Sequence, residues 1–231
     1  MLINYTFNNY LSFKQETTLS LETGDRLRKY SDNTMSVDVA NSKNKIDLLK
    51  NIIIFGGNGS GKSNLLSSLS LMKTIISNIP PKATTKLPKR SFLLDGFSKE
   101  KNSSFEIELI QNNTQYKYFF EYNRKQIVNE TLEIFNKNKY ETYFKRTNCS
   151  NYDIVPKHLS TFTNETRDNV LFLQTAQGKN DSVSIDIIKW FEESLVFFTH
   201  RSSEDLIYLL KKPDNKKKFL KFMVLADMNM I

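Results

Sequence analysis

Eight consecutive residues, GGNGSGKS at positions 56–63, most constrain what this chain can fold into. They match the pattern G-x-x-x-x-G-K-[ST], in which glycines let the backbone curl so that its amides point at phosphate oxygens. The chain has only seven glycines, and four of them fall within this stretch. We therefore predict a phosphate-binding loop here rather than an ordinary glycine turn.

The flanking residues favour the same interpretation. Residues 48–55 end in the apolar run Ile52–Phe55, which is typical of a strand buried on both faces. Residues 62–79 carry apolar side chains at helical spacing, and Pro80 and Pro81 end that pattern. The predicted order of strand, loop and helix is the one that such a loop requires.

We predict that a nucleotide site at this loop would bind ATP and Mg²⁺. Lys62 would bridge the β- and γ-phosphates as a catalytic residue, and the Ser63 hydroxyl would bind the metal. The start of the helix would add positive charge. The residues predicted to contact the cofactor are Gly56, Gly57, Asn58, Gly59, Ser60, Gly61, Lys62, Ser63 and Asn64.

The rest of the chain shows extended patterns first and helical patterns later. Polar turns separate four extended runs after residue 104 and predict an antiparallel meander, and helical spacing dominates after residue 165. We predict an α/β nucleotide-binding lobe over residues 1–155 and a helical segment over 156–231. The extended runs are 2–7, 14–21, 48–55, 105–110, 116–122, 127–135 and 140–145, with loops expected at 22–46 and 82–102.

Composition narrows the class of protein. The chain of 231 residues is 39% hydrophobic and 25% charged, which is typical of a folded domain. Its apolar runs are far shorter than the roughly 20 residues that span a bilayer, and no secretory signal is evident, so we expect a cytoplasmic protein without a membrane partner. The net charge of +8 favours polyanionic partners, including nucleic acid. Lys216–Lys218 is either a nucleic-acid contact or a solvated helix face.

The loop and the residues around it resemble a known group of proteins. GGNGSGKS followed by Asn64 is similar to the Walker A loop of the SMC, RecF and OLD-type ABC ATPases, and Asn9–Phe13 resembles the N-F/Y-x-S-F element of that group. Residues 92–95, 104–107 and 169–173 are similar to its AAA-fifteen branch, often found in bacterial abortive-infection and phage-defence loci. The resemblance implies a P-loop, ABC-ATPase-like N-terminal lobe and an ATPase activity.

The resemblance also implies a glutamine that senses the metal and the attacking water. Gln174 is the candidate for this catalytic and metal-binding role, with Gln177 second. The alternative interpretation is a glutamine that faces solvent in a loop.

Other elements that the resemblance implies are incomplete in the sequence. Asp95 and Asp227 each follow an apolar run, as a Walker B aspartate would, but neither is followed by glutamate. His200 is a candidate switch histidine or a simple boundary residue. No signature loop is present, so we expect hydrolysis to need a second lobe, in a homodimer or in a partner ATPase.

Two functional classes therefore remain open. The first is an ATP-binding lobe that signals to an effector protein, and the second is a non-catalytic scaffold derived from an ATPase head. An alternating row of aromatic side chains is also open to two interpretations, as core or as a platform for stacking bases. This row consists of Tyr116, Tyr118, Phe120 and Tyr122.

Overall fold

The computed structural model describes the chain except for residues 25–30, 41–44, 198–209, 212 and 226–231. The chain divides into two compact units, Met1–Phe191 and Glu192–Ile231, and each is considered by itself. The short helices that follow residue 155 pack on the sheet of the first unit.

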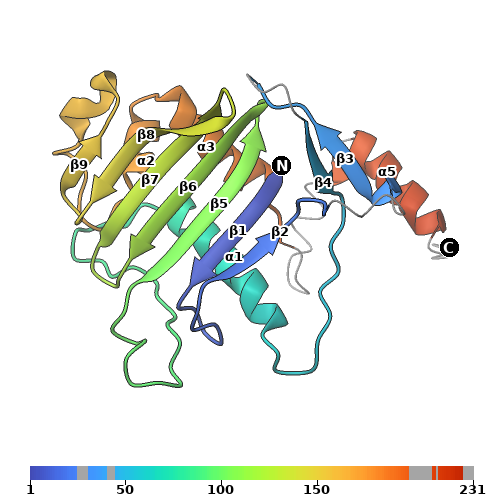
Figure 1. Cartoon of the computed structure of the whole chain (residues 1–231), viewed down its shortest axis with the longest axis horizontal. Helices are drawn as coiled ribbons and strands as arrows, with labels where there is room; N and C mark the ends of the chain where they lie inside the picture. The colour runs from blue at the N-terminus through green and yellow to red at the C-terminus, as the bar shows by residue number, and fades with distance from the viewer. Residues whose placement is uncertain (25–30, 41–44, 198–209, 212, 226–231) are drawn as a thin grey trace. The chain divides into compact units, whose positions relative to one another are not determined.

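A seven-stranded antiparallel sheet forms the centre of the first unit (Figure 1). The strands lie in the order β2-β1-β5-β6-β7-β8-β9, and each pairs antiparallel with its neighbours. The predicted meander is confirmed as β5 to β8, whereas β9 was not predicted. The strands are Leu2–Asn8 (β1), Thr17–Ser20 (β2), Ser103–Gln111 (β5), Thr114–Tyr122 (β6), Ile127–Asn136 (β7), Lys139–Thr147 (β8) and Asn151–Ile154 (β9).

One face of this sheet carries the core. Side chains alternate between the two faces of a strand, and the register places Phe105 opposite Phe120 and Ile107 opposite Tyr118 on the same face. The interpretation of the aromatic row on β6 as a platform for stacking bases is wrong, because all its members are buried. They are Tyr116, Tyr118, Phe120 and Tyr122.

Helices cover the aromatic face. The helix α1 (Lys62–Ser77) packs on β1, where the Tyr5 hydroxyl donates to Ser68 Oγ at 2.9 Å. The predicted helix over 62–79 is therefore confirmed, two residues shorter. Farther along the sheet, α2 (Phe172–Gly178) packs on β8, where the rings of Phe144 and Phe172 meet edge to face with centroids 5.1 Å apart. The 3₁₀ helix Lys157–Phe162 and α3 (Ser182–Lys189) flank α2 in the sequence.

A buried ion pair joins α2 to the sheet. The Glu130 carboxylate accepts hydrogen bonds from the amides of Phe172 and Leu173 at 2.7 and 2.9 Å, at the start of α2. Arg146 Nη1 lies 3.6 Å from the same carboxylate, and both side chains are buried. Burial raises the pKa of Glu130, while the Arg146 charge and the helix amides oppose that rise. The pair thus fixes where α2 begins.

Two expectations for the first half of the chain need correction. Residues 22–46 were predicted to be loop, but β3 (Thr34–Val37) and the start of β4 (Ile46–Leu49) form a separate antiparallel hairpin there. Residues 48–55 were predicted to form one buried strand. The structure instead ends the strand at Leu49, and residues 51–56 belong to no strand. A small apolar cluster that includes Ile3, Leu48 and Ile110 accounts for the hairpin, because it buries Leu48 against the main sheet.

The second unit contains α5 (Pro213–Leu225), which includes the predicted helical run over 219–225. A π-helical turn, Trp190–Ser194, spans the boundary between the units in the sequence. Lys216–Lys218 are exposed on α5, as a solvated helix face would be. Across the described ranges, no helix combines the length and apolar character that crossing a membrane requires.

Candidate nucleotide-binding site

Residues 56–61 form a tight loop directly before α1. Gly59 and Gly61 have φ angles of 80° and 95°, in the left-handed region that favours glycine. The Ser60 amide donates to the Gly57 carbonyl at 3.3 Å and closes a turn. A Cβ atom at Gly56 would lie 2.6 Å from Ser60 Oγ, so a larger residue there would require the Ser60 side chain to move. The curl of this loop therefore depends on Gly59 and Gly61.

The loop leads into the N-terminal end of α1, where backbone amides remain free. The first helical hydrogen bond runs from the Leu65 amide to the Gly61 carbonyl at 3.0 Å. The preceding amides of Lys62, Ser63 and Asn64 donate to no acceptor in the part of the chain that the structure describes. Free amides at a helix N-terminus attract anions, and the helix dipole adds to the attraction. This end of α1 is therefore suited to bind phosphate.

The two side chains predicted to carry the chemistry lie at the same place. The Lys62 ammonium donates to the carbonyls of Gly56 and Gly57 at 2.7 and 2.8 Å, so it is held against the loop. Ser63 is exposed in the first turn of α1, and its hydroxyl bonds to no described residue. No acidic residue occurs in that turn. The loop thus presents a cation, amides and a hydroxyl without a competing carboxylate.

The Asn9–Phe13 element packs against the loop. Gly61 packs so closely on it that a Cβ atom there would lie 2.9 Å from Ser12 Oγ and 3.1 Å from the Phe13 ring. Asn64 donates from Nδ2 to Ser12 Oγ at 2.9 Å. Asn64 was predicted as a cofactor contact, but its side chain bonds to Ser12. Only its backbone amide is left for a phosphate.

The same element is tied to the long loop between α1 and β5. The Asn9 side chain is buried, and its Nδ2 donates to the carbonyls of Ser98, Lys101 and Asn102 at 2.8 to 3.1 Å. Its Oδ1 accepts from the Phe92 amide at 3.0 Å. Residues 9–13 and 92–102, which the sequence showed as separate stretches, are therefore one structural support.

Gln174 lies far from this loop. Its Nε2 donates to the carbonyls of Ile75 and Ile76 at 3.0 and 2.9 Å, at the C-terminal end of α1, and its side chain is buried. Ser63 is at the other end, and twelve residues of helix separate Ser63 from Ile75, about 18 Å at 1.5 Å per residue. The expected role of Gln174 as a metal ligand is therefore corrected to a structural one, which joins α2 to α1.

Asp95, one of the candidate acidic residues, bonds to residues outside the loop. Asp95 accepts from the Ser98 amide at 2.6 Å and pairs with Lys14 at 2.9 Å. These bonds, that of Lys14 foremost, hold the pKa of Asp95 well below its usual value. Asp227 and His200 lie outside the described residues. Within the described ranges, no three His, Cys, Asp or Glu side chains gather as metal ligands would.

The segment before the loop is apolar and exposed. Ile53 is 74% exposed and Phe55 86%, and Ile52 and Ile54 are more than one-third exposed. Four consecutive large apolar side chains rarely face water without a partner. The segment therefore has the composition of a buried strand but not the environment of one.

A family comparison agrees with the geometry of the loop. Residues 52–151 match the AAA domain. The family model is described as an AAA domain, putative AbiEii toxin, Type IV TA system. The match supports an ATPase domain of ABC/AAA type. Such a domain implies the binding of nucleotide and the use of Mg²⁺. A search of curated proteins finds no match.

The matched range can be followed on the structure. It includes the exposed apolar segment, the loop, α1 and the strands β5 to β8. It does not include β1 or the Asn9–Phe13 element, which nevertheless packs against the loop. The support for the loop therefore comes partly from outside the matched range.

Proposed function

We propose that this chain is the nucleotide-binding lobe of a P-loop ATPase and that it binds Mg·ATP on residues 56–64. The free backbone amides of Lys62, Ser63 and Asn64, together with the Lys62 ammonium on the same loop, carry this proposal. The amides and the ammonium would bind the β- and γ-phosphates. The Ser63 hydroxyl would hold Mg²⁺, which neutralises charge on the phosphates when bound.

The loop fits a metal–nucleotide complex but lacks the groups that would activate water. No described carboxylate bonds to residues 56–64, and Gln174 lies at the far end of α1. Phosphoryl transfer relies on positioned charges and an oriented water. We therefore propose that the isolated chain binds ATP and turns it over weakly, and that a second lobe or a dimer partner supplies the missing groups.

The exposed segment before the loop supports a partner of this kind. A strand of a second lobe, or of another copy, would cover Ile52–Phe55 and remove four apolar side chains from water. Replacement of Ile53 and Phe55 by aspartate should preserve the fold and prevent ATP-dependent association in light scattering. The matched control is Leu94→Asp, at an apolar residue that is 87% exposed elsewhere.

Nucleotide titration tests the proposal directly. Calorimetry should show Mg·ATP binding that Lys62→Ala weakens at least tenfold, because the variant removes the only side-chain cation in the loop. Lys157→Ala, at an exposed lysine far along the sequence, should leave binding unchanged. An unaltered melting curve with millimolar Mg·ATP would contradict the proposal.

The non-catalytic scaffold is the second candidate, and the lack of a described carboxylate at the loop favours it. The two candidates differ in turnover after assembly. If ATP binds but phosphate release stays at background at every protein concentration and with every partner lobe, the scaffold is favoured. Robust turnover by the chain alone that Lys62→Ala abolishes would instead show that no partner is needed.

The biological setting that we propose is bacterial defence or a DNA-linked process, with an effector protein as partner. The proposal rests on the family description, which names a putative AbiEii toxin and a type IV toxin–antitoxin system. Expression of the gene with its neighbours should reduce phage plaque formation, and Lys62→Ala should restore it. Equal plaque counts with and without the wild-type gene would contradict this setting.

A further inference from the structure

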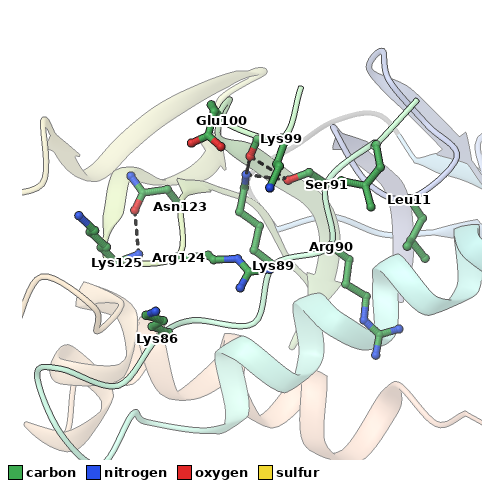
Figure 2. Close-up of a pocket in the computed structure, with 11 residues that line it drawn as sticks. Leu11, Lys86, Lys89, Arg90, Ser91, Lys99, Glu100, Asn123, Arg124 and Lys125 are labelled. Atoms are coloured by element: carbon green, nitrogen blue, oxygen red, sulfur yellow. Dashed lines mark hydrogen bonds between the residues drawn. The ribbon is translucent and has the colours of Figure 1, made fainter. Parts of the chain in front are cut away.

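A basic hollow lies beside the support of the loop, at a place that the proposed ATP site does not use (Figure 2). Its volume is about 760 Å³. Three segments form its walls: the turn at Leu11, residues 86–100 of the long loop, and residues 123–125 between β6 and β7. The sequence showed residues 82–102 only as a basic loop, so the cavity depends on the tertiary structure.

The charge on these walls is strongly unbalanced. Six basic side chains line the hollow, and Glu100 is the one carboxylate among its lining residues. None of the six forms an ion pair with a carboxylate of the described chain, whereas Lys117 on the open sheet face bonds to Glu106 at 3.2 Å. The basic residues are Lys86, Lys89, Arg90, Lys99, Arg124 and Lys125.

Lys89 is the structural centre of the hollow. Its ammonium donates to Ser91 Oγ and to the carbonyls of Lys99 and Lys101, at 2.7, 3.0 and 2.6 Å. All three of its N–H groups are therefore used. Burial lowers the pKa of Lys89; nearby Glu100 opposes this effect, and the Arg124 charge adds to it. Lys89 thus fixes the loop and contributes charge rather than free donors.

Backbone hydrogen bonds hold the three walls together. The Leu87 amide donates to the Arg124 carbonyl at 2.9 Å, and the Leu11 amide donates to the Arg90 carbonyl at 2.9 Å. The Asn123 carboxamide oxygen accepts from the Lys125 amide at 2.8 Å and shapes the third wall. These bonds keep the three backbone segments on a common frame, so the points from which the cationic side chains extend stay close together.

Such an arrangement calls for a ligand with several negative charges. Like charges that are held close together raise the energy of a site, and a polyanion lowers it. The side chains of Lys86, Arg124 and Lys125 are exposed and make no hydrogen bond to a described residue, so their donors are available. A single small anion would reach only part of a hollow that is lined from three segments.

We propose that this hollow is a second anion site, distinct from residues 56–64, which binds a chain of consecutive phosphate groups. Two sources share this chemistry: a phosphoanhydride chain, as in a polyphosphate, and the phosphodiester backbone of a single-stranded nucleic acid. Leu11 and Leu93 also line the hollow and would contact the apolar part of a nucleic-acid ligand. The site is next to the loop, because Leu11 precedes Ser12, which bonds to Asn64.

The test uses the full chain with Lys62→Ala as background, so that the ATP site does not contribute and failure of the ATP proposal leaves the result interpretable. The probes are inorganic tripolyphosphate, measured by calorimetry, and a fluorescent twelve-nucleotide oligo(dT), measured by anisotropy at low salt. The hollow variant is Lys86→Glu with Arg124→Glu. The matched control makes the same charge change at two exposed lysines elsewhere, Lys137→Glu with Lys157→Glu.

At least one probe should bind, and the hollow variant should weaken that binding at least tenfold while the control changes it less than twofold. For the oligonucleotide, loss of two phosphate contacts should reduce the slope of log K against log salt by about 1.4. Binding of tripolyphosphate alone assigns a phosphoanhydride ligand, and binding of oligo(dT) alone assigns a phosphodiester. If neither probe binds, or if the hollow variant and the control weaken binding equally, the proposal is wrong.

Folding is checked separately. The hollow variant should melt within a few degrees of its background by circular dichroism, since both replaced side chains are exposed. If it does not, Lys86→Gln with Lys125→Gln removes charge without reversing it. That variant should still weaken binding at least threefold, and unchanged binding would overturn the proposal.

Discussion

The aromatic face of the sheet and the segment before the glycine-rich loop are similar in composition and opposite in environment. Phe105 in β5 is fully buried among the rings of its neighbours, whereas Phe55 is 86% exposed. The sheet completes its own core because antiparallel neighbours and helices cover one face. The segment over 52–55 has no neighbouring strand among the described residues. An apolar sequence therefore indicates that burial would be favourable, but the arrangement of neighbouring strands and helices decides whether the segment is buried.

The largest expected effect comes from the two phenylalanines that define this comparison. Phe105→Ala should lower the free energy of unfolding by about 3–5 kcal/mol, because it leaves a cavity in a packed core. Phe55→Ala should change it by less than about 0.5 kcal/mol, as exposed substitutions usually do. Urea unfolding measures both values. A loss above 2 kcal/mol for Phe55→Ala would break the comparison, since it would show that the segment is packed in solution.

The buried ion pair between Glu130 and Arg146 gives a second test of how strongly the sheet depends on buried contacts. Arg146→Ala should destabilise the fold by about 3–5 kcal/mol at pH 7, because it leaves the Glu130 carboxylate buried without its charge partner. Burial already raises the pKa of Glu130, and the variant raises it further. Protonation of Glu130 then relieves the penalty, so the loss should shrink as the pH falls from 7 toward 5.

Unfolding at several pH values tests this sign. Lys145→Ala is the matched control, because Lys145 lies on the same strand and its ion pair with Asp153 is exposed at 3.9 Å. Its effect should stay below about 1 kcal/mol at every pH. An Arg146→Ala penalty that grows toward pH 5 would contradict the assigned role of Glu130.

Replacement of Gln174 distinguishes a structural role for this residue from a metal-binding one. Gln174→Ala should lower the free energy of unfolding by about 1–3 kcal/mol, because it leaves carbonyls at the end of α1 and the Leu171 amide without their partner. The apparent affinity for Mg²⁺ in the presence of ATP should not change. Calorimetry at several Mg²⁺ concentrations checks this, with Gln177→Ala as control. A tenfold lower apparent affinity for Mg²⁺ would restore the metal-ligand interpretation.

The smallest expected effect on stability lies in the loop itself. Gly61→Ala places a side chain at a φ angle of 95° and within 2.9 Å of Ser12 Oγ, so it should cost about 1–2 kcal/mol and weaken ATP binding. Gly57→Ala meets no atom within 4 Å and should leave the fold unchanged. Melting curves and nucleotide titration of both variants are the measurements. Equal destabilisation by the two would show that the Ser12 contact does not constrain the loop.

Much of the fold could be predicted from local patterns. The four strands of the meander alternate apolar and polar residues, and the helix after the loop has apolar residues at helical spacing, so both were recognised. The hairpin of β3 and β4 was missed because only a small apolar cluster around Leu48 reveals it. Residues 50–55 were assigned to a buried strand because their composition is the same with or without a neighbouring strand.

The candidate site shows the same division. Glycine spacing followed by Lys62 and Ser63 is a local signal, because the loop and the helix that use these residues are adjacent in the chain. Gln174 was misplaced because a glutamine after an apolar run has the same sequence pattern whether it caps a distant helix or faces a metal. The basic hollow was missed because its cations come from segments more than twenty residues apart.

The sequence by itself determined the tight glycine-rich loop, the helix that follows it and the alternating strands, because each depends on interactions between residues close together in the chain. The tertiary structure decided that Asn9–Phe13 supports the loop, that Gln174 joins two helices, and that six cations share one hollow. Those contacts join residues far apart in the chain, and local spacing holds no information about which distant surfaces will meet.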